Sequence, residues 1–131
     1  YVVIHQVGSQ YIEEYEGLSS SRYRPIAFLG DEMPDLMKSA KYILSRSGAG
    51  TVAELIALGK PSLFVPLKIA QKNEQYHNAM EANRLIGSIV IEEVDFADCN
   101  LISELKKIPA SSIPQDREHA TKIILEEVLD S

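Results

Sequence analysis

The sequence predicts an α/β domain in which a mostly parallel sheet carries helices on both faces. Short apolar runs rich in β-branched residues alternate along the chain with segments whose apolar residues recur at helical spacing. Such alternation is typical of right-handed βαβ crossovers, which place helices on both sides of a parallel sheet. The 131 residues, 45% of them hydrophobic, suit a single Rossmann-like domain over 1–131.

Five short apolar segments predict the strands of this sheet, in the order 1–5, 25–29, 42–45, 62–66 and 88–91. Val, Ile, Leu and Phe dominate these segments, as expected for parallel strands that are buried on both faces. Between the first two strands, residues 10–24 are polar and predict irregular structure or a short helix. No internal repeat and no low-complexity linker divides the chain.

Segments with helical periodicity lie between and after these strands. The first predicted helix follows Asp31 and has Pro34 in its first turn, where a missing N–H costs little. The second runs through Leu58, and the third covers about 74–85. Gly59 and Gly87 are expected to end them, because glycine readily adopts the left-handed conformation that closes a helix.

Two further helices are expected near the end of the chain, at about 98–107 and 116–129. In the last of these, Ile123, Ile124, Val128 and Leu129 would share one side.

Composition and charge exclude several classes of protein. The net charge is −6 and no long Lys/Arg cluster occurs, so nucleic-acid binding is not expected. Cys99 is the only cysteine, which excludes an internal disulfide and fits a reducing compartment. No apolar run approaches the roughly 20 residues of a membrane span, and no signal peptide is visible. The chain begins at Tyr1, inside an apolar run and without an initiator Met, so we expect it to derive from a longer protein.

The loop after the third strand, SRSGAGTVAEL (45–55), carries the strongest functional signal. Its glycines let a ligand approach the backbone, and the helix that follows offers N–H groups with partial positive charge. Ser47 and Thr51 could add hydroxyl donors. A plain turn is an equal alternative, because Thr51 and Glu54 have the spacing of a capping box. The loop matches neither the P-loop pattern nor GxGxxG, which disfavours ATP hydrolysis and standard dinucleotide binding.

A second polar cluster, QKNEQYHN (71–78), precedes and opens the third helix. Gln75 and Asn78 are three residues apart and so share a helix face, and their amides suit sugar hydroxyls. A solvated first turn is the alternative. His5 is expected to be packed at a strand end. The histidines and Cys99 lack the spacing of metal ligands, so no metal site is expected.

Three motifs together resemble the C-terminal, nucleotide-binding half of MurG-type glycosyltransferases (family 28, GT-B fold). They are HQVG after the first strand, GDEM, and the run SRSGAGTVAELIALGKPSLFVP followed by EQYHNA. The resemblance covers residues 1–92 and, more loosely, the final helices. It implies transfer of N-acetylglucosamine from its UDP donor to a lipid-linked acceptor in peptidoglycan synthesis. Related transferases with dolichol-linked or diacylglycerol acceptors, and UDP-N-acetylglucosamine epimerases, remain alternatives.

The resemblance also implies roles for individual residues. The diphosphate would lie at the loop Ser47, Gly48, Ala49, Gly50 and Thr51 and beside the turn Gln6, Val7 and Gly8. Glu54 would bind the ribose hydroxyls, and Gly30 and Met33 would lie at the uracil. Glu74 and Gln75 would contact the donor sugar and the phosphates, and Asn78 would contact the sugar. Three positions depart from the family pattern. Val7 replaces a hydroxyl residue, Glu74 replaces an amide and brings a negative charge, and Lys41 stands where the family often has Asp.

In that family the acceptor displaces UDP directly, with inversion and without a metal, a cofactor or a protein nucleophile. The general base and the acceptor groove belong to an N-terminal domain that is absent from this chain. We therefore expect the chain alone to bind the donor weakly at most and to be inactive. A peripheral position at the cytoplasmic face of the plasma membrane is implied by the acceptor, and a separate N-terminal subunit is an alternative to fusion.

Overall fold

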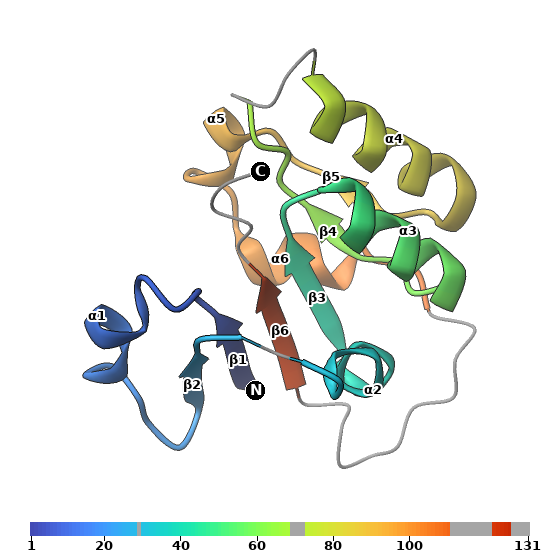
Figure 1. Cartoon of the computed structure of the whole chain (residues 1–131). Helices are drawn as coiled ribbons and strands as arrows, with labels where there is room; N and C mark the ends of the chain where they lie inside the picture. The colour runs from blue at the N-terminus through green and yellow to red at the C-terminus, as the bar shows by residue number, and fades with distance from the viewer. Residues whose placement is uncertain (29, 69–72, 111–121, 127–131) are drawn as a thin grey trace.

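The structure, a computed structural model, describes residues 1–28, 30–68 and 73–110, together with the backbone of 122–126. Within these residues, six parallel strands form one sheet in the order β2-β1-β6-β3-β4-β5 (Figure 1). The strands are β1 Val2–Gln6, β2 Tyr23–Ile26, β3 Tyr42–Ser45, β4 Leu63–Phe64, β5 Ile89–Val90 and β6 Lys122–Glu126. The predicted α/β class with a parallel sheet is confirmed.

Helices lie on both faces of the sheet, as expected. They are α1 Ile12–Glu16, α2 Met33–Ser39, α3 Ala49–Leu58, α4 Glu74–Ile86, α5 Glu93–Phe96 and α6 Leu101–Lys106. Helices α2, α3 and α4 pack over one core cluster, which includes Phe64, whereas Leu105 of α6 packs with Leu63 in the other cluster. Leu63 and Phe64 are neighbours in β4, so the alternation of side chains along a strand supplies both cores.

Glycine determines where the two longest helices end. Gly59 (φ 66°) and Gly87 (φ 75°) both adopt the left-handed conformation directly after α3 and α4. The N–H of Gly59 donates to Ile56 and that of Gly87 to Asn83, which satisfies carbonyls at the helix ends. Both predicted stops are confirmed, as are Pro34 in the first turn of α2 and the strand at 42–45.

The end of the chain differs most from the prediction. Residues 122–126 form β6, which pairs with β1 and β3, so the helix expected over 116–129 is wrong there; residues 116–121 and 127–129 lie outside the described residues. Ile123 to Leu125 are three consecutive apolar residues, and such a short apolar run is compatible with a buried parallel strand as well as with a helix. Pairing on both sides of the strand then decides its conformation.

Smaller differences concern the lengths of elements. β2 begins two residues before the predicted segment, and β4 and β5 contain two residues each. Helix α5 was not expected, and α6 covers only 101–106 of the predicted 98–107. For residues 10–24 the sequence left irregular structure and a short helix as alternatives, and the structure has the short helix α1.

The strand order places a topological switch point at the carboxyl edge of the sheet. From β1 the sheet continues outward to β2, whereas from β3 it continues the other way through β4 to β5. The loops after β1 and β3 therefore leave the sheet on either side of β6, and such a switch point is where open α/β sheets bind ligands. None of the helices in the described part of the chain has the length and apolar character of a membrane span.

Candidate functional site

Three segments at the carboxyl edge line an open cavity of about 420 Å³. Gln6 ends β1, Gly30 and Met33 lie before and at the start of α2, and Glu54 projects from α3. The complete lining consists of Gln6, Phe28, Gly30, Asp31, Met33, Pro34 and Glu54. The structure thus brings together four residues that the sequence singled out from three distant motifs. Phe28, Asp31 and Pro34 were not predicted as site residues, although Asp31 lies within the GDEM motif and Phe28 and Pro34 lie close to its ends.

Glu54 lies in the middle of α3, not at its start. The N-cap of α3 is Gly48, so Thr51 is the third residue of the helix and Glu54 the sixth. The capping-box alternative is therefore wrong, because its hydroxyl residue would have to occupy the N-cap. Glu54 is half-buried, and its carboxylate makes no hydrogen bond or ion pair with any residue that the structure describes. Glu54 lines the cavity.

The N-terminus of α3 is open and has no side-chain cap. Gly48 has an extended backbone (φ −61°, ψ 151°), and no side chain accepts a hydrogen bond from the first turn at the N-cap position. Ala49 and Gly50 are exposed. The first N–H groups of a helix have no intrahelical acceptor, and together with the helix dipole they favour an anion. A Cβ built on Gly48 or Gly50 would meet no atom within 4 Å.

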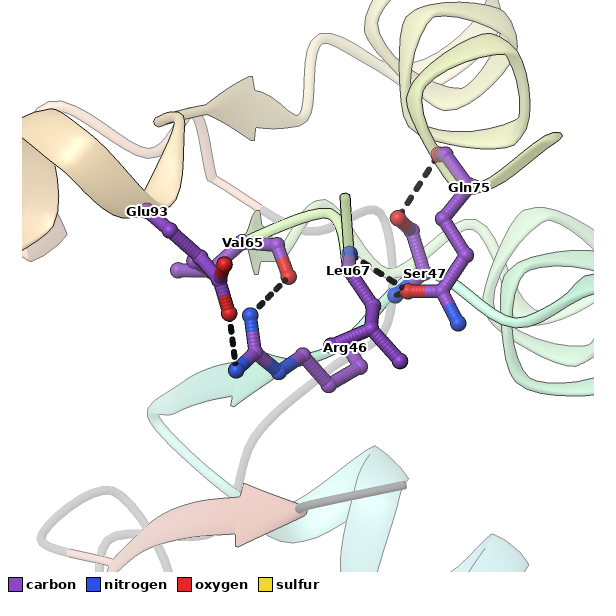
Figure 2. A network of polar contacts seen from close by, with 6 residues as sticks. All are labelled: Arg46, Ser47, Val65, Leu67, Gln75 and Glu93. Carbon is purple, nitrogen blue, oxygen red and sulfur yellow. Dashed lines mark hydrogen bonds and ion pairs between the residues drawn. The ribbon is translucent and has the colours of Figure 1, made fainter. Parts of the chain in front are cut away.

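Ser47 is held from several sides by α4. It is 0% exposed; its N–H donates to Oε1 of Gln75 (3.3 Å) and its hydroxyl donates to the carbonyl of Gln75 (2.7 Å) (Figure 2). The Nδ2 of Asn78 donates to the carbonyl of Ser47 (3.1 Å). These three predicted site residues are therefore brought together, but they bond to one another and not across the cavity at Glu54.

Arg46, for which the sequence predicted no role, connects the glycine loop to two other segments. Its Nη1 donates to the carbonyl of Val65 (3.2 Å), and its Nη2 pairs with Glu93 Oε1 (2.5 Å) at the start of α5 (Figure 2). The guanidinium thereby joins the ends of β3 and β4 to the segment after β5. Its position inside the SRSGAG motif is the feature of the sequence that could have identified Arg46 as a site residue.

The turn after β1 is fixed by the neighbouring strand. Val7 is fully buried and its N–H donates to Ile26 (2.9 Å), while the N–H of Gly8 (φ 85°) donates to Ala27 (3.0 Å). Both N–H groups therefore already have acceptors. His5 is packed as expected: its Nδ1 lies 2.7 Å from the hydroxyl of Tyr23.

Glu74 lies apart from the cavity at Glu54. It is the first residue of α4 and is exposed, and it does not line that cavity. Among the described residues, no group of three or more His, Cys, Asp or Glu side chains is placed to hold a metal ion.

A buried lysine connects the two helices that line the cavity. Lys60 follows α3, is 1% exposed, and its Nζ donates to the carbonyl of Ala40 (2.5 Å) at the end of α2. Burial lowers the pKa of Lys60 from 10.5 to about 8, because the charged ammonium loses its hydration.

The depressed pKa of Lys60 predicts a defined pH dependence of stability. Between pH 8 and 10.5 the unfolded chain binds this proton more strongly than the folded chain, so the free energy of unfolding rises with pH. The rise is at most roughly 3 kcal/mol. Denaturation midpoints measured from below pH 8 to pH 10.5 give this rise, and Lys60→Met should remove most of the slope. An identical slope in that variant would contradict this assignment.

Comparison with known proteins gives consistent matches. The model of the glycosyltransferase family 28 C-terminal domain matches residues 1–128. A Clostridium botulinum protein named UDP-N-acetylglucosamine--N-acetylmuramyl-(pentapeptide) pyrophosphoryl-undecaprenol N-acetylglucosamine transferase is 34% identical over 105 residues, covering 79% of this chain and 29% of that protein. Its namesake from Aquifex aeolicus is 33% identical over 106 residues, covering 81% and 30% respectively.

A solved structure has the same fold. The crystal structure of Acinetobacter baumannii MurG matches with a TM-score of 0.59 at 24% identity, covering 79% of this chain and 36% of that chain. This match confirms the Rossmann-like fold. The chain spans less than a third of the length of the two curated relatives.

Proposed function

Because the chain belongs to glycosyltransferase family 28, whose C-terminal domain model covers residues 1–128, we propose that it forms the nucleotide-sugar donor site of a glycosyltransferase. One observation carries the proposal: the uncapped N-terminus of α3 lies on the same helix as an acidic residue that lines a cavity. Gly50 and Glu54 are four residues apart and so share a face, with a rise of about 6 Å between them.

The proposed ligand is a uridine diphosphate sugar. The diphosphate would accept hydrogen bonds from the first N–H groups of α3, at Gly48 to Gly50. The carboxylate of Glu54, about one turn further along α3, would accept hydrogen bonds from the ribose hydroxyls. The base would lie between Phe28 and Met33, beside the backbone of Gly30, where apolar side chains and a bare backbone meet. The names of the curated relatives favour UDP-N-acetylglucosamine as this donor.

The proposed chemistry is direct displacement of UDP from the anomeric carbon by an acceptor hydroxyl. The departing diphosphate gains negative charge, and preorganised N–H donors at the start of α3 would stabilise it. The acceptor and the general base would come from a preceding domain, a proposal that the greater length of the relatives supports. A lipid-linked acceptor, as in the relatives' names, would place the complete protein at the cytoplasmic face of the membrane.

Calorimetric titration of the chain with UDP, UDP-N-acetylglucosamine and ATP tests this function. We expect weak binding of both uridine nucleotides, weaker or no binding of ATP, and no turnover without a separate acceptor domain. Tighter binding of ATP than of UDP would refute the assignment of the donor. Transferase activity of the chain alone would refute the proposal that the acceptor site and the general base lie in a separate domain.

A further inference from the structure

We propose that Arg46 is a positioning residue, whose guanidinium fixes the point at which the chain leaves β3 for the start of α3, and that Glu93 holds this guanidinium in place. The inference rests on the proposed donor site, because the start of α3 is where the diphosphate would bind. Neither Arg46 nor Glu93 is among the residues that line the cavity at Glu54.

The pairing of β3 with β4 stops where the glycine loop (residues 46–51) begins. The last bond of this ladder runs from the N–H of Val65 to the carbonyl of Ser45 (2.9 Å). In a regular parallel ladder the next bond would run from the N–H of Ser47 to the carbonyl of Val65. The N–H of Ser47 instead donates to Oε1 of Gln75 (3.3 Å), so the chain turns away from β4 toward α4.

The side chain of Arg46 replaces the donor that the ladder lacks. Val65 is buried, and its carbonyl accepts a hydrogen bond from Nη1 of Arg46 (3.2 Å) (Figure 2). A buried carbonyl without a donor is destabilising. The guanidinium therefore lets the N–H of Ser47 bond to α4 while the carbonyl of Val65 stays paired. Because Ser47 directly precedes Gly48, the N-cap of α3, this exchange of partners sets where the open helix N-terminus lies.

Glu93 fixes the direction of the guanidinium. Its Oε1 lies 2.5 Å from Nη2 of Arg46 (Figure 2). Glu93 is the first residue of α5, and Phe96 of the same helix packs against the core cluster that contains Val65. The carboxylate is therefore carried by a packed element, and the ion pair holds the guanidinium beside the end of β4.

Direct contact between Arg46 and the diphosphate is the alternative, and removal of Glu93 distinguishes the two roles. If Arg46 bound the phosphates, loss of the competing carboxylate would free the guanidinium and raise the affinity for UDP. If Arg46 positions the loop, loss of Glu93 lowers the affinity for UDP, although a negative charge has been removed from the neighbourhood of an anionic ligand. Uridine carries no phosphate and would use only the cavity at Glu54, so its affinity should not change.

The experiment measures dissociation constants of UDP and uridine for Arg46→Met, Glu93→Ala and the double variant. We expect UDP affinity to fall roughly tenfold in Arg46→Met and roughly threefold in Glu93→Ala, and the double variant to bind no more weakly than Arg46→Met. Arg84→Met is the matched control, because Arg84 also forms a 2.5 Å ion pair, with Glu81, but lies in the last turn of α4. Unchanged UDP affinity in Arg46→Met, unchanged or higher UDP affinity in Glu93→Ala, or an equal loss for uridine would overturn the proposal.

Amide hydrogen exchange tests the positioning role without a ligand. In Arg46→Met the amide of Val65, which forms the last bond of the β3–β4 ladder, should exchange at least tenfold faster than in the unaltered chain. The amide of Ile91, which donates to the carbonyl of Phe64 on the β5 side of β4, should keep its protection. Unchanged exchange at Val65 would refute the positioning role. Failure of the unaltered chain to bind UDP would instead refute the proposed function, while the exchange result would stand.

Discussion

Replacing Glu54 by glutamine is expected to weaken UDP binding by roughly ten- to a hundredfold without destabilising the domain. A carboxylate that accepts hydrogen bonds from two ribose hydroxyls forms charge-assisted bonds, which are roughly twice as strong as neutral ones. Glutamine has nearly the same helix propensity, and Glu54 contacts no polar group among the described residues that would be left unpaired. Calorimetry with UDP and a thermal melt measure the two quantities separately.

Glu14→Gln is the control for Glu54→Gln, because Glu14 is an exposed residue of the short helix α1, outside the cavity. It should change neither affinity nor stability. If Glu54→Gln instead lowered the melting temperature and left UDP binding intact, Glu54 would be a structural residue of α3.

Replacing Gly50 by alanine is expected to raise stability and lower affinity in the same variant. Gly50 lies in the first turn of α3, and a Cβ there would meet no atom within 4 Å, so the fold does not require glycine. Alanine is favoured over glycine within helices by up to about 1 kcal/mol. A diphosphate bound at the helix N-terminus would collide with the added methyl group, and UDP affinity should fall about tenfold.

Gly17→Ala is the matched control for Gly50→Ala, since a Cβ on Gly17 also meets no atom within 4 Å and Gly17 follows α1. It should leave UDP affinity unchanged. Undiminished UDP affinity in Gly50→Ala would mean that no ligand occupies the space above this part of α3.

The sequence predicted those elements whose ends carry a local signal. Gly59 and Gly87 close α3 and α4 through left-handed backbone, and this preference is visible in the sequence alone. β6 could not be predicted in this way, because Ile123 and Ile124 fit a helix face and a strand equally well. Its conformation depends on pairing with β1 and β3, which are distant in sequence.

The candidate site was likewise predicted only in part. The positions of HQVG, GDEM and SRSGAG after strands were enough to predict that Gln6, Gly30 and Glu54 lie near one another. The sequence could not show which polar atoms pair, so Ser47 was expected to face a phosphate and Gln75 a sugar. In the structure the N–H and the hydroxyl of Ser47 both donate to Gln75, a pairing that depends on how α4 packs against the loop. Thr51 and Glu54 illustrate the limit of a motif, because their spacing fits a cap while the helix begins at Ala49.

The most direct test of the proposed site is a titration of the ¹⁵N-labelled chain with UDP, followed by backbone amide chemical shifts. The largest shifts are expected at Gly48, Ala49 and Gly50, with smaller shifts at Gly30 and Met33. Shifts centred on the separate hollow lined by Tyr76, Asp95 and Cys99, with none at the start of α3, would contradict it.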